Sequence, residues 1–264
     1  MGYPSGLHII ERAGPAPGAP AVVLVHGSLD RAESFRRLMR RLPEFRIVAY
    51  DRRGYQGSRA AGVVGLRGHI ADLVGIGHEA RAGGGATVVA IGHSVGGDVV
   101  IGAALAETGL FDSIGAFEPP MPWLGFRRTP PGEGRPNSWT PLAEDPAEEV
   151  ERFFRRMVSP SAWQRLSEQG RASRRADGPA LMADLLDLRG DLPFEVTDLT
   201  VPALFGRGGP TSEAHHRDAV AWLATHVPGA ALYEIEGAQH GAHLSHPDAF
   251  ADFTRSVARR AHPL

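Results

Sequence analysis

One short stretch constrains the fold of this 264-residue chain more than any other. Residues 88–91 are all apolar, they run directly into Gly-His-Ser-Val-Gly at 92–96, and a segment rich in small apolar residues follows. This order predicts a buried strand, a sharp turn and a helix. In such a turn Ser94 must adopt a strained backbone with positive φ, so that its hydroxyl stands clear of the sheet. Gly92 and Gly96 lie where a side chain would collide as strand and helix cross.

The same turn has a chemical meaning. The N–H of Val95 opens the predicted helix and points toward whatever the Ser94 hydroxyl attacks. A glycine-rich turn that holds an incidental serine gives the same five letters, because short motifs also occur by chance. The rest of the chain therefore has to decide between the two interpretations.

The composition is that of an ordinary globular protein. With 42% hydrophobic residues the chain can bury a sizeable core, and its length fits one large domain or a domain with an insertion. The net charge of −2 gives no electrostatic basis for binding nucleic acid or an anionic membrane. There is no cysteine, which excludes disulfides and thiolate chemistry. No apolar run is long enough to span a bilayer and no leader-like segment opens the chain, so we expect a cytoplasmic protein without nucleic-acid or membrane partners.

Strand and helix patterns alternate along most of the chain. Strands are expected at 7–11, 21–25, 45–50, 87–91, 113–117, 201–206 and 230–235, and helices at 32–42, 66–82, 95–107, 212–226 and 247–260. Between about 120 and 198 strand signal is lacking, and helices are expected at 145–158, 161–173 and 178–189. We therefore predict an α/β fold with a doubly wound, mostly parallel sheet formed by 1–119 and 199–264, and an inserted helical cap at 120–198.

Polar side chains follow the predicted strands where each strand ends. They are His26, Asp51, Ser94, Glu118, Arg207 and His240. The carboxyl ends of parallel strands meet at one edge of a sheet, and ligands of such sheets bind there. We expect these residues to gather on one rim, which a purely structural role does not explain.

Several segments together resemble the α/β-hydrolase fold family, over essentially the whole length of the chain. They are His26-Gly27, the loop Asp-Arg-Arg-Gly-Tyr-Gln-Gly-Ser at 51–58, the turn at 92–97 and Gly-Ala-Gln-His-Gly at 237–241. The resemblance implies that Ser94 is a nucleophile and His240 its general base. It also implies an oxyanion hole formed by the N–H groups of Val95 and Ser28, with Leu29 as the alternative to Ser28.

The acid of the triad departs from the family pattern. The family usually places an Asp just after its seventh strand, and Gly209 stands at that position here. Some members carry the acid after the sixth strand instead, where this chain has Glu118 followed by two prolines. A carboxylate is needed to hold the imidazole tautomer and to stabilise the imidazolium. We favour Glu118, with Glu213 or a water-bridged pair without an acid as alternatives.

The other histidines receive structural interpretations. His240 is preferred over His243 and His246 because it comes first after the strand and lies among small residues. His215 and His216 read as a pair on a helix surface, and no metal site is expected. We expect the following residues to line a substrate pocket: Leu29, His93, Trp123 and Trp139.

The resemblance implies a serine hydrolase that cleaves a carboxylic ester of a small, mainly apolar molecule through an acyl-enzyme on Ser94. Such a mechanism needs no cofactor and no partner beyond the small-molecule substrate, and the chain is expected to be a monomer or homodimer. The same scaffold supports C–C bond hydrolysis, lactone hydrolysis, acyl transfer and perhydrolysis. Epoxide hydrolases and haloalkane dehalogenases of the family use Asp at the turn, so Ser94 counts against both. A non-catalytic ligand-binding protein remains the third alternative, because Gly209 replaces the usual acid.

Overall fold

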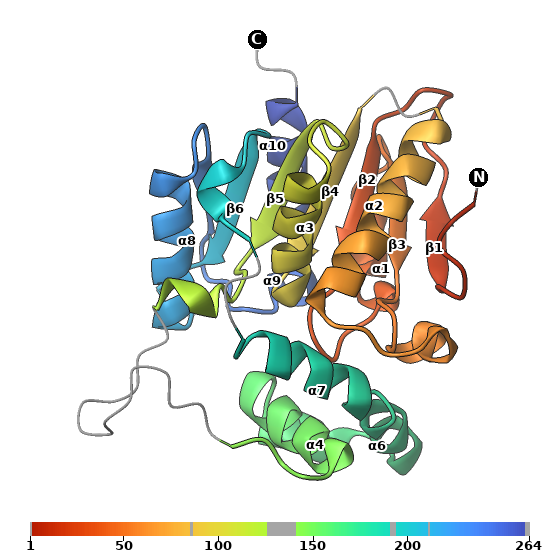
Figure 1. Ribbon diagram of the computed structural model, residues 1–264, viewed down its shortest axis with the longest axis vertical. Coiled ribbons are helices and arrows are strands. Elements are labelled where there is room, and N and C mark those ends of the chain that lie inside the picture. The colour runs from red at the N-terminus through yellow and green to blue at the C-terminus, as the bar shows by residue number, and fades with distance from the viewer. Residues whose placement is uncertain (1, 85–86, 126–140, 191–193, 211, 262–264) are drawn as a thin grey trace.

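A computed structural model describes residues 2–84, 87–125, 141–190, 194–210 and 212–261 (Figure 1). Its centre is a seven-stranded sheet in the order β1-β3-β2-β4-β5-β6-β7. The strands are β1 (Ile9–Arg12), β2 (Ala21–Val25), β3 (Arg46–Tyr50), β4 (Val88–His93), β5 (Ser113–Phe117), β6 (Ala203–Gly208) and β7 (Ala231–Ile235). Only the edge strand β1 runs antiparallel to its neighbour, so the prediction of a mostly parallel, doubly wound sheet is confirmed.

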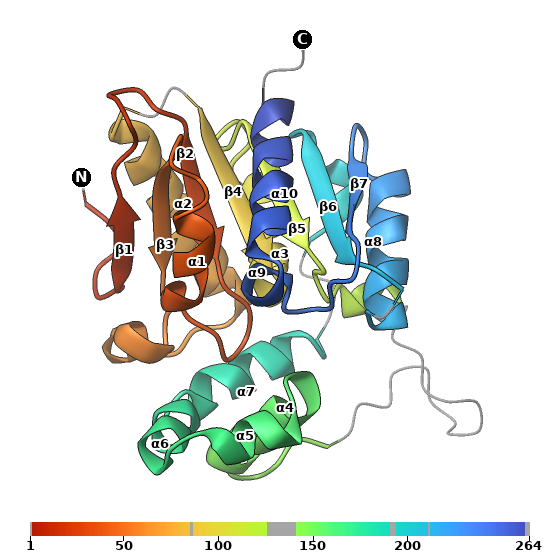
Figure 2. The same cartoon turned by 180° about the vertical axis from the view of Figure 1, so that it is seen from behind.

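Helices cover both faces of the sheet, which is why the central strand β2 is apolar at every position. One face carries α2 (Leu66–Ala82), α3 (Val95–Ala106) and α8 (Ala214–His226), and the other carries α1 (Arg36–Met39), α9 (Ala242–Ser245) and α10 (Pro247–Arg260) (Figures 1 and 2). Successive residues of β2 point alternately into the two cores: Val23 packs on the α2 side and Val22 and Leu24 on the α10 side. All five residues of β2 are fully buried.

Four further helices form a separate layer across the carboxyl ends of the strands (Figures 1 and 2). They are α4 (Pro146–Met157), α5 (Pro160–Arg165), α6 (Glu168–Arg175) and α7 (Gly178–Asp187), and we call them the α4–α7 layer. The sequence predicted one helix over 161–173, but Ser167 accepts a hydrogen bond from the Gly170 N–H and starts a new helix. An N-cap serine ends one helix and opens the next because its side chain satisfies an N–H that no carbonyl reaches.

Two further differences concern short elements. The helix expected at 32–42 is a 3₁₀ turn, η1 (Ala32–Phe35), followed by the single turn of α1, and it tightens again toward Pro43 through a bond from the Arg41 N–H to the Leu38 carbonyl. Helix α9 was not predicted, because four residues are too few to show a period. The other 3₁₀ turns are η2 (Gln56–Ala61), η3 (Pro122–Leu124) and η4 (Val196–Asp198). Among the described helices none is both long and apolar enough to cross a membrane.

Candidate active site

Ser94 stands at the turn between β4 and α3 with φ 54° and ψ −132°, a conformation that L-residues rarely adopt. The flanking glycines explain how the chain tolerates this turn. A Cβ on Gly92 would lie 2.1 Å from the carbonyl oxygen of Gly96, and one on Gly96 would lie 2.3 Å from the carbonyl oxygen of Val25. Backbone therefore crosses backbone at both positions, and the crossing sets the Ser94 side chain at the carboxyl edge of the sheet.

Two of the predicted site residues meet directly. His240 follows β7, and its Nδ1 lies 2.8 Å from Oε2 of Glu118, which follows β5. The other carboxylate oxygen accepts hydrogen bonds from the Gly208 N–H at 2.8 Å and from the Ser212 hydroxyl at 2.5 Å. Glu118 is fully buried and has φ 46°. A strained backbone thus aims a buried carboxylate at the imidazole, with each oxygen hydrogen-bonded.

The protonation state of Glu118 follows from these contacts. Burial alone would raise the pKa of its carboxyl group. Hydrogen bonds from His240, Ser212 and the Gly208 N–H act in the opposite direction and outweigh it, so the pKa lies below its ordinary value. An ionised Glu118 only accepts hydrogen bonds, so Nδ1 of His240 carries a proton and donates it to the carboxylate.

The position that the family usually gives to Asp is filled differently. A Cβ on Gly209 would lie 3.1 Å from the Gly237 nitrogen, so a larger residue would crowd the backbone there. The preceding residue, Gly208, donates its N–H to Glu118 instead. Glu213 is exposed at the start of α8. The structure therefore brings Glu118, rather than Glu213, to His240.

His93, the residue before Ser94, is tied to the loop that carries the imidazole. Its Nε2 lies 2.7 Å from the carbonyl oxygen of His240, so Nε2 is the protonated nitrogen. Burial first, and then the electrostatic influence of the neighbouring His243 and His240, lower the pKa of His93 well below its ordinary value. A neutral, buried His93 thus fixes the backbone of His240 relative to the turn of Ser94.

The interpretation of His216 as a surface residue is wrong. The ring is buried and stacks on His240, with centroids 4.5 Å apart and planes inclined by 15°. His215, beside it, is half-buried. Residues on α8 face inward about every three to four positions, and 216 falls in line with buried 219, 220 and 223, a spacing that could have identified it. His246 directly precedes α10.

The segment that is predicted to supply an oxyanion donor, residues 27–29, lies against Ser94; we call it the oxyanion loop. A Cβ on Gly27 would lie 2.9 Å from Cβ of Ser94. The hydroxyl of Ser28 donates to Oδ2 of Asp184 at 2.6 Å, so this side chain points toward α7. Leu29 has φ 55° and its side chain is buried in the α4–α7 layer.

The remaining pocket residues are placed only in part. Trp123 is half-buried and packs edge-on against Phe194, with ring centroids 6.1 Å apart. Trp139 lies outside the described residues. His93 is buried behind the nucleophile, where its ring contacts those of His240 and His243 at 4.7 and 4.3 Å. Its described contacts are with these two histidines, with the ring of Phe117 and with the backbone of His240.

The chain is similar to one known protein family over most of its length. A model described as "Alpha/beta hydrolase family" matches residues 22–253. The chain belongs to the alpha/beta hydrolase family. The resemblance seen in its sequence is therefore confirmed at the level of family and fold.

Individual relatives of this alpha/beta hydrolase are distant. It is 33% identical to Epoxide hydrolase A of Mycobacterium tuberculosis (strain ATCC 25618 / H37Rv) over 130 residues, 47% of this chain and 38% of that protein. An enol-lactonase from Burkholderia xenovorans LB400 superimposes with a TM-score of 0.69 at 20% identity, covering 95% of each chain. A thermophilic esterase from Thermogutta terrifontis superimposes with a TM-score of 0.65 at 18% identity, covering 97% of this chain and 94% of that chain. These structures share the fold.

Sequence reasoning missed the central carboxylate between the sheet and the α4–α7 layer of this hydrolase. Asp51 accepts hydrogen bonds from the N–H groups of Ala32 and Gly57, and Arg52 binds Asp184 through two hydrogen bonds of 3.0 and 2.6 Å. Asp184 lies on the buried stripe of α7 formed by 181, 184, 185 and 188. A charge in an apolar stripe is the signal that could have identified it.

Two groups of described residues could hold a metal ion in this hydrolase. The donor atoms of Asp30, His93 and His243 lie within 4.8 Å of one another, and so do those of Glu118, His216 and His240. Imidazole and carboxylate donors suit ions such as Zn²⁺. A metal ion bound by Glu118, His216 and His240 would compete with the hydrogen bond between His240 and Glu118.

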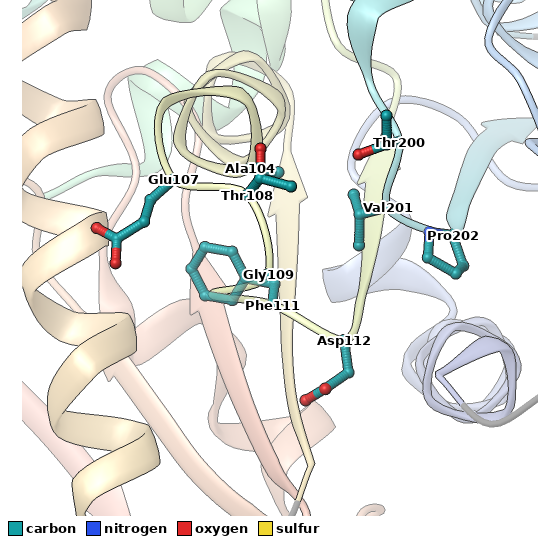
Figure 3. A pocket seen from close by; sticks show the side chains of 9 residues that line it. All are labelled: Ala104, Glu107, Thr108, Gly109, Phe111, Asp112, Thr200, Val201 and Pro202. Carbon is teal, nitrogen blue, oxygen red and sulfur yellow. The ribbon is translucent and has the colours of Figure 1, made fainter.

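A separate pocket of about 200 Å³ lies away from these residues (Figure 3). Its lining comes from the end of α3 and from the segments that enter β5 and β6: Ala104, Glu107, Thr108, Gly109, Phe111, Asp112, Thr200, Val201 and Pro202. These are the amino ends of the strands, whereas Ser94, Glu118 and His240 follow the carboxyl ends. This pocket therefore has no part in chemistry at Ser94.

Proposed function

We propose that this alpha/beta hydrolase is a serine hydrolase that cleaves a carboxylic ester of a small, mainly apolar molecule. The observation that carries the proposal is the 2.8 Å hydrogen bond between His240 Nδ1 and Glu118, at the same sheet edge as the strained Ser94. It supplies the tautomer of His240 that a serine nucleophile requires.

In this mechanism the Nε2 lone pair of His240 takes the hydroxyl proton of Ser94 as the oxygen attacks the ester carbonyl. Glu118 stabilises the imidazolium that forms. The proton then passes from Nε2 to the leaving alcohol, and an acyl-enzyme on Ser94 remains. Water, deprotonated by the same nitrogen, attacks the acyl carbon and releases the acid.

Charge on the carbonyl oxygen would be stabilised by two N–H groups. Val95 is the first residue of α3, so its N–H is free of an intrahelical partner and lies at the positive end of the helix dipole. The Ser28 N–H supplies the second, beside Ser94. Donors fixed before the reaction need no reorganisation, and each is worth about 10²–10³ in kcat.

The choice of substrate class rests on the nucleophile and on the fold neighbours. A serine attacks acyl carbon and is released by water, which favours esters and lactones over epoxides, for which the family uses Asp. The esterase and the enol-lactonase with similar folds act on such bonds, as their names state. The α4–α7 layer serves as the cap in this proposal, and Trp123 lines the substrate side. C–C bond hydrolysis, acyl transfer and perhydrolysis use the same nucleophile and are the alternative functions.

Labelling with a fluorophosphonate probe tests the proposal. We expect the wild type to be labelled, and Ser94→Ala and His240→Ala to remain unlabelled with unchanged thermal midpoints. A panel of nitrophenyl esters of short and long acids then measures acyl size, with hydrolysis of an aryl epoxide as the comparison. Absence of labelling in a folded wild type would favour the non-catalytic alternative, and turnover of the epoxide by Ser94→Ala would remove the serine from the mechanism.

A further inference from the structure

The oxyanion loop is held from outside the sheet. The Ser28 hydroxyl donates to Asp184 of α7 at 2.6 Å, and Arg174 of α6 donates from Nη1 to the Leu29 carbonyl oxygen, also at 2.6 Å. The Leu29 side chain, 5% exposed, belongs to the apolar core of the α4–α7 layer, together with Val150, Phe154, Trp163, Leu181 and Leu185. The Ser28 hydroxyl, the Leu29 carbonyl oxygen and the Leu29 side chain are thus all bound to one layer of helices.

The anchor on the layer side is rigid. Asp184 is 2% exposed and also accepts hydrogen bonds from both terminal nitrogens of Arg52 and, at 2.6 Å, from the Tyr55 hydroxyl. Arg52 in turn donates from Nε to the carbonyl oxygen of His26 at 3.0 Å. The carboxylate therefore holds the residue before the oxyanion loop through Arg52 and the loop itself through Ser28. A bidentate guanidinium–carboxylate pair of this kind fixes direction as well as distance.

The loop needs such support because its conformation is strained. Leu29 has φ 55°, a backbone region that residues with a side chain rarely adopt and that persists only where the surroundings hold it. Without contacts at the Ser28 hydroxyl and the Leu29 carbonyl, the loop would relax toward ordinary backbone angles. Relaxation would turn the peptide units of the loop, including the N–H of Ser28.

We propose that Asp184 and Arg174 are positioning residues for the oxyanion hole, and that the Ser28 N–H holds its catalytic direction only while the α4–α7 layer is docked on the oxyanion loop. The inference rests on the proposed function, because the hole belongs to that mechanism. The layer thereby couples coverage of the substrate to the stabilisation of charge on it.

A second contact between the layer and the sheet provides a matched control. Asp177, just before α7, accepts from the N–H of Gln56 at 3.0 Å and from Nε of Arg59 at 2.7 Å. Arg59 therefore docks the same layer as Arg174 does, without touching the oxyanion loop. Loss of docking in general and loss of loop support can be separated by comparing these two arginines.

The first measurement is steady-state ester hydrolysis by Arg174→Met and Arg59→Met. We expect Arg174→Met to lower kcat about 10-fold or more with KM within about threefold, because a misdirected oxyanion donor weakens transition-state binding only. Arg59→Met should keep kcat within about twofold. Ser28→Ala should resemble Arg174→Met, and Ser28→Thr, which keeps the hydroxyl, should restore most of kcat. Equal losses in the two arginine variants would overturn the proposal.

Amide hydrogen exchange across residues 27–29 gives a readout that does not depend on activity. Exchange should accelerate in Arg174→Met and in Ser28→Ala and should match the wild type in Arg59→Met, at equal thermal midpoints. Unchanged exchange in both loop-side variants would overturn the proposal even if activity fell. If the fluorophosphonate does not label the wild type but exchange still accelerates in Arg174→Met and Ser28→Ala, the coupling between layer and loop stands and the serine hydrolase is refuted.

Discussion

Glu118 reaches His240 through a backbone conformation that glutamate rarely adopts. With φ 46° the residue leaves β5 sharply, and the carboxylate enters a site made by the end of β6, where the Gly208 N–H and the Ser212 hydroxyl donate to it. The usual site of the acid thus supplies hydrogen-bond donors to Glu118 rather than a carboxylate of its own. The role of Glu118 therefore depends on Gly208 at the end of β6, on Ser212 before α8 and on His240 after β7.

The charge of Glu118 can be tested alone. Glu118→Gln keeps the shape of the side chain but removes the charge that stabilises the imidazolium, and we expect kcat for esters to fall by about 10³-fold or more. The matched control is Glu213→Gln, which should keep wild-type kcat because that residue is exposed and Nδ1 of His240 faces Glu118 instead. Stopped-flow or steady-state ester assays measure both. The opposite ranking of the two variants would assign the acid to Glu213.

Asp98 is a buried acid that the mechanism does not use. Burial raises its pKa well above the ordinary value, despite the opposing effects of the Met121 N–H and Arg52. A carboxyl whose pKa is raised on folding lowers stability as the pH rises above its unfolded value of about 3.9. Asp98→Asn removes this penalty, and we expect unfolding free energy to increase by roughly 1–3 kcal/mol at pH 7.

The pH dependence distinguishes this effect from simple repacking. The gain of Asp98→Asn in urea or thermal unfolding should shrink as the pH is lowered toward about 4, where the wild-type carboxyl is protonated in both states. Asp252→Asn, on the exposed face of α10, serves as the control and should show no such trend. If the gain in unfolding free energy does not depend on pH, ionisation of Asp98 is not what lowers the stability of the wild type.

Among the elements, the junction of β4 and α3 is the least tolerant of change. Gly92→Ala would place a methyl group 2.1 Å from the Gly96 carbonyl oxygen, and backbone cannot move away without displacing Ser94. We expect a loss of about 3 kcal/mol or more, or failure to fold, as is typical where a side chain meets backbone. Gly241→Ala is the control, because a Cβ there meets nothing within 4 Å and φ is −83°. Thermal unfolding midpoints of the two variants are compared, and equal midpoints would contradict the close approach of backbone at Gly92.

The elements that the sequence predicts well are those whose pattern is long and local. The helix expected at 66–82 and the one at 247–260 have the observed bounds, since many apolar positions repeat along each. The helix expected at 161–173 breaks in two because one cap residue, Ser167, outweighs the propensity of its neighbours. Cap residues act through single hydrogen bonds, so a periodic pattern does not reveal them.

On the scale of the whole molecule, the sequence predicts the edge where the site lies better than the contacts within it. Parallel strands bring their carboxyl ends together by topology alone, so Ser94, Glu118 and His240 could be placed on one edge. The partners of Arg52 and Ser28 could not, because Asp184 lies 132 and 156 residues further along the chain. Such contacts depend on how the α4–α7 layer docks, and no local pattern records that.

This docking contact gives a prediction for the stability of the whole molecule. Arg52→Met leaves Asp184 buried without its guanidinium, and we expect a loss of about 3–5 kcal/mol at pH 7. Arg155→Met, which breaks only a half-exposed pair with Glu151 within α4, should cost less than about 1 kcal/mol. Urea unfolding at pH 7 measures the difference, and similar costs would contradict a central role for the buried pair.

The same pair makes the difference depend on pH in a known direction. In the wild type, Arg52 and His69 outweigh burial and hold the pKa of Asp184 well below its ordinary value, so the pair stabilises the fold above about pH 4 and is lost only in acid. In Arg52→Met burial acts with less opposition and raises that pKa, so the variant loses stability as the pH rises. The deficit of Arg52→Met should therefore be largest near pH 7 and shrink as the pH approaches 4. A deficit that grows in acid would show that Asp184 depends on groups other than Arg52 for its charge.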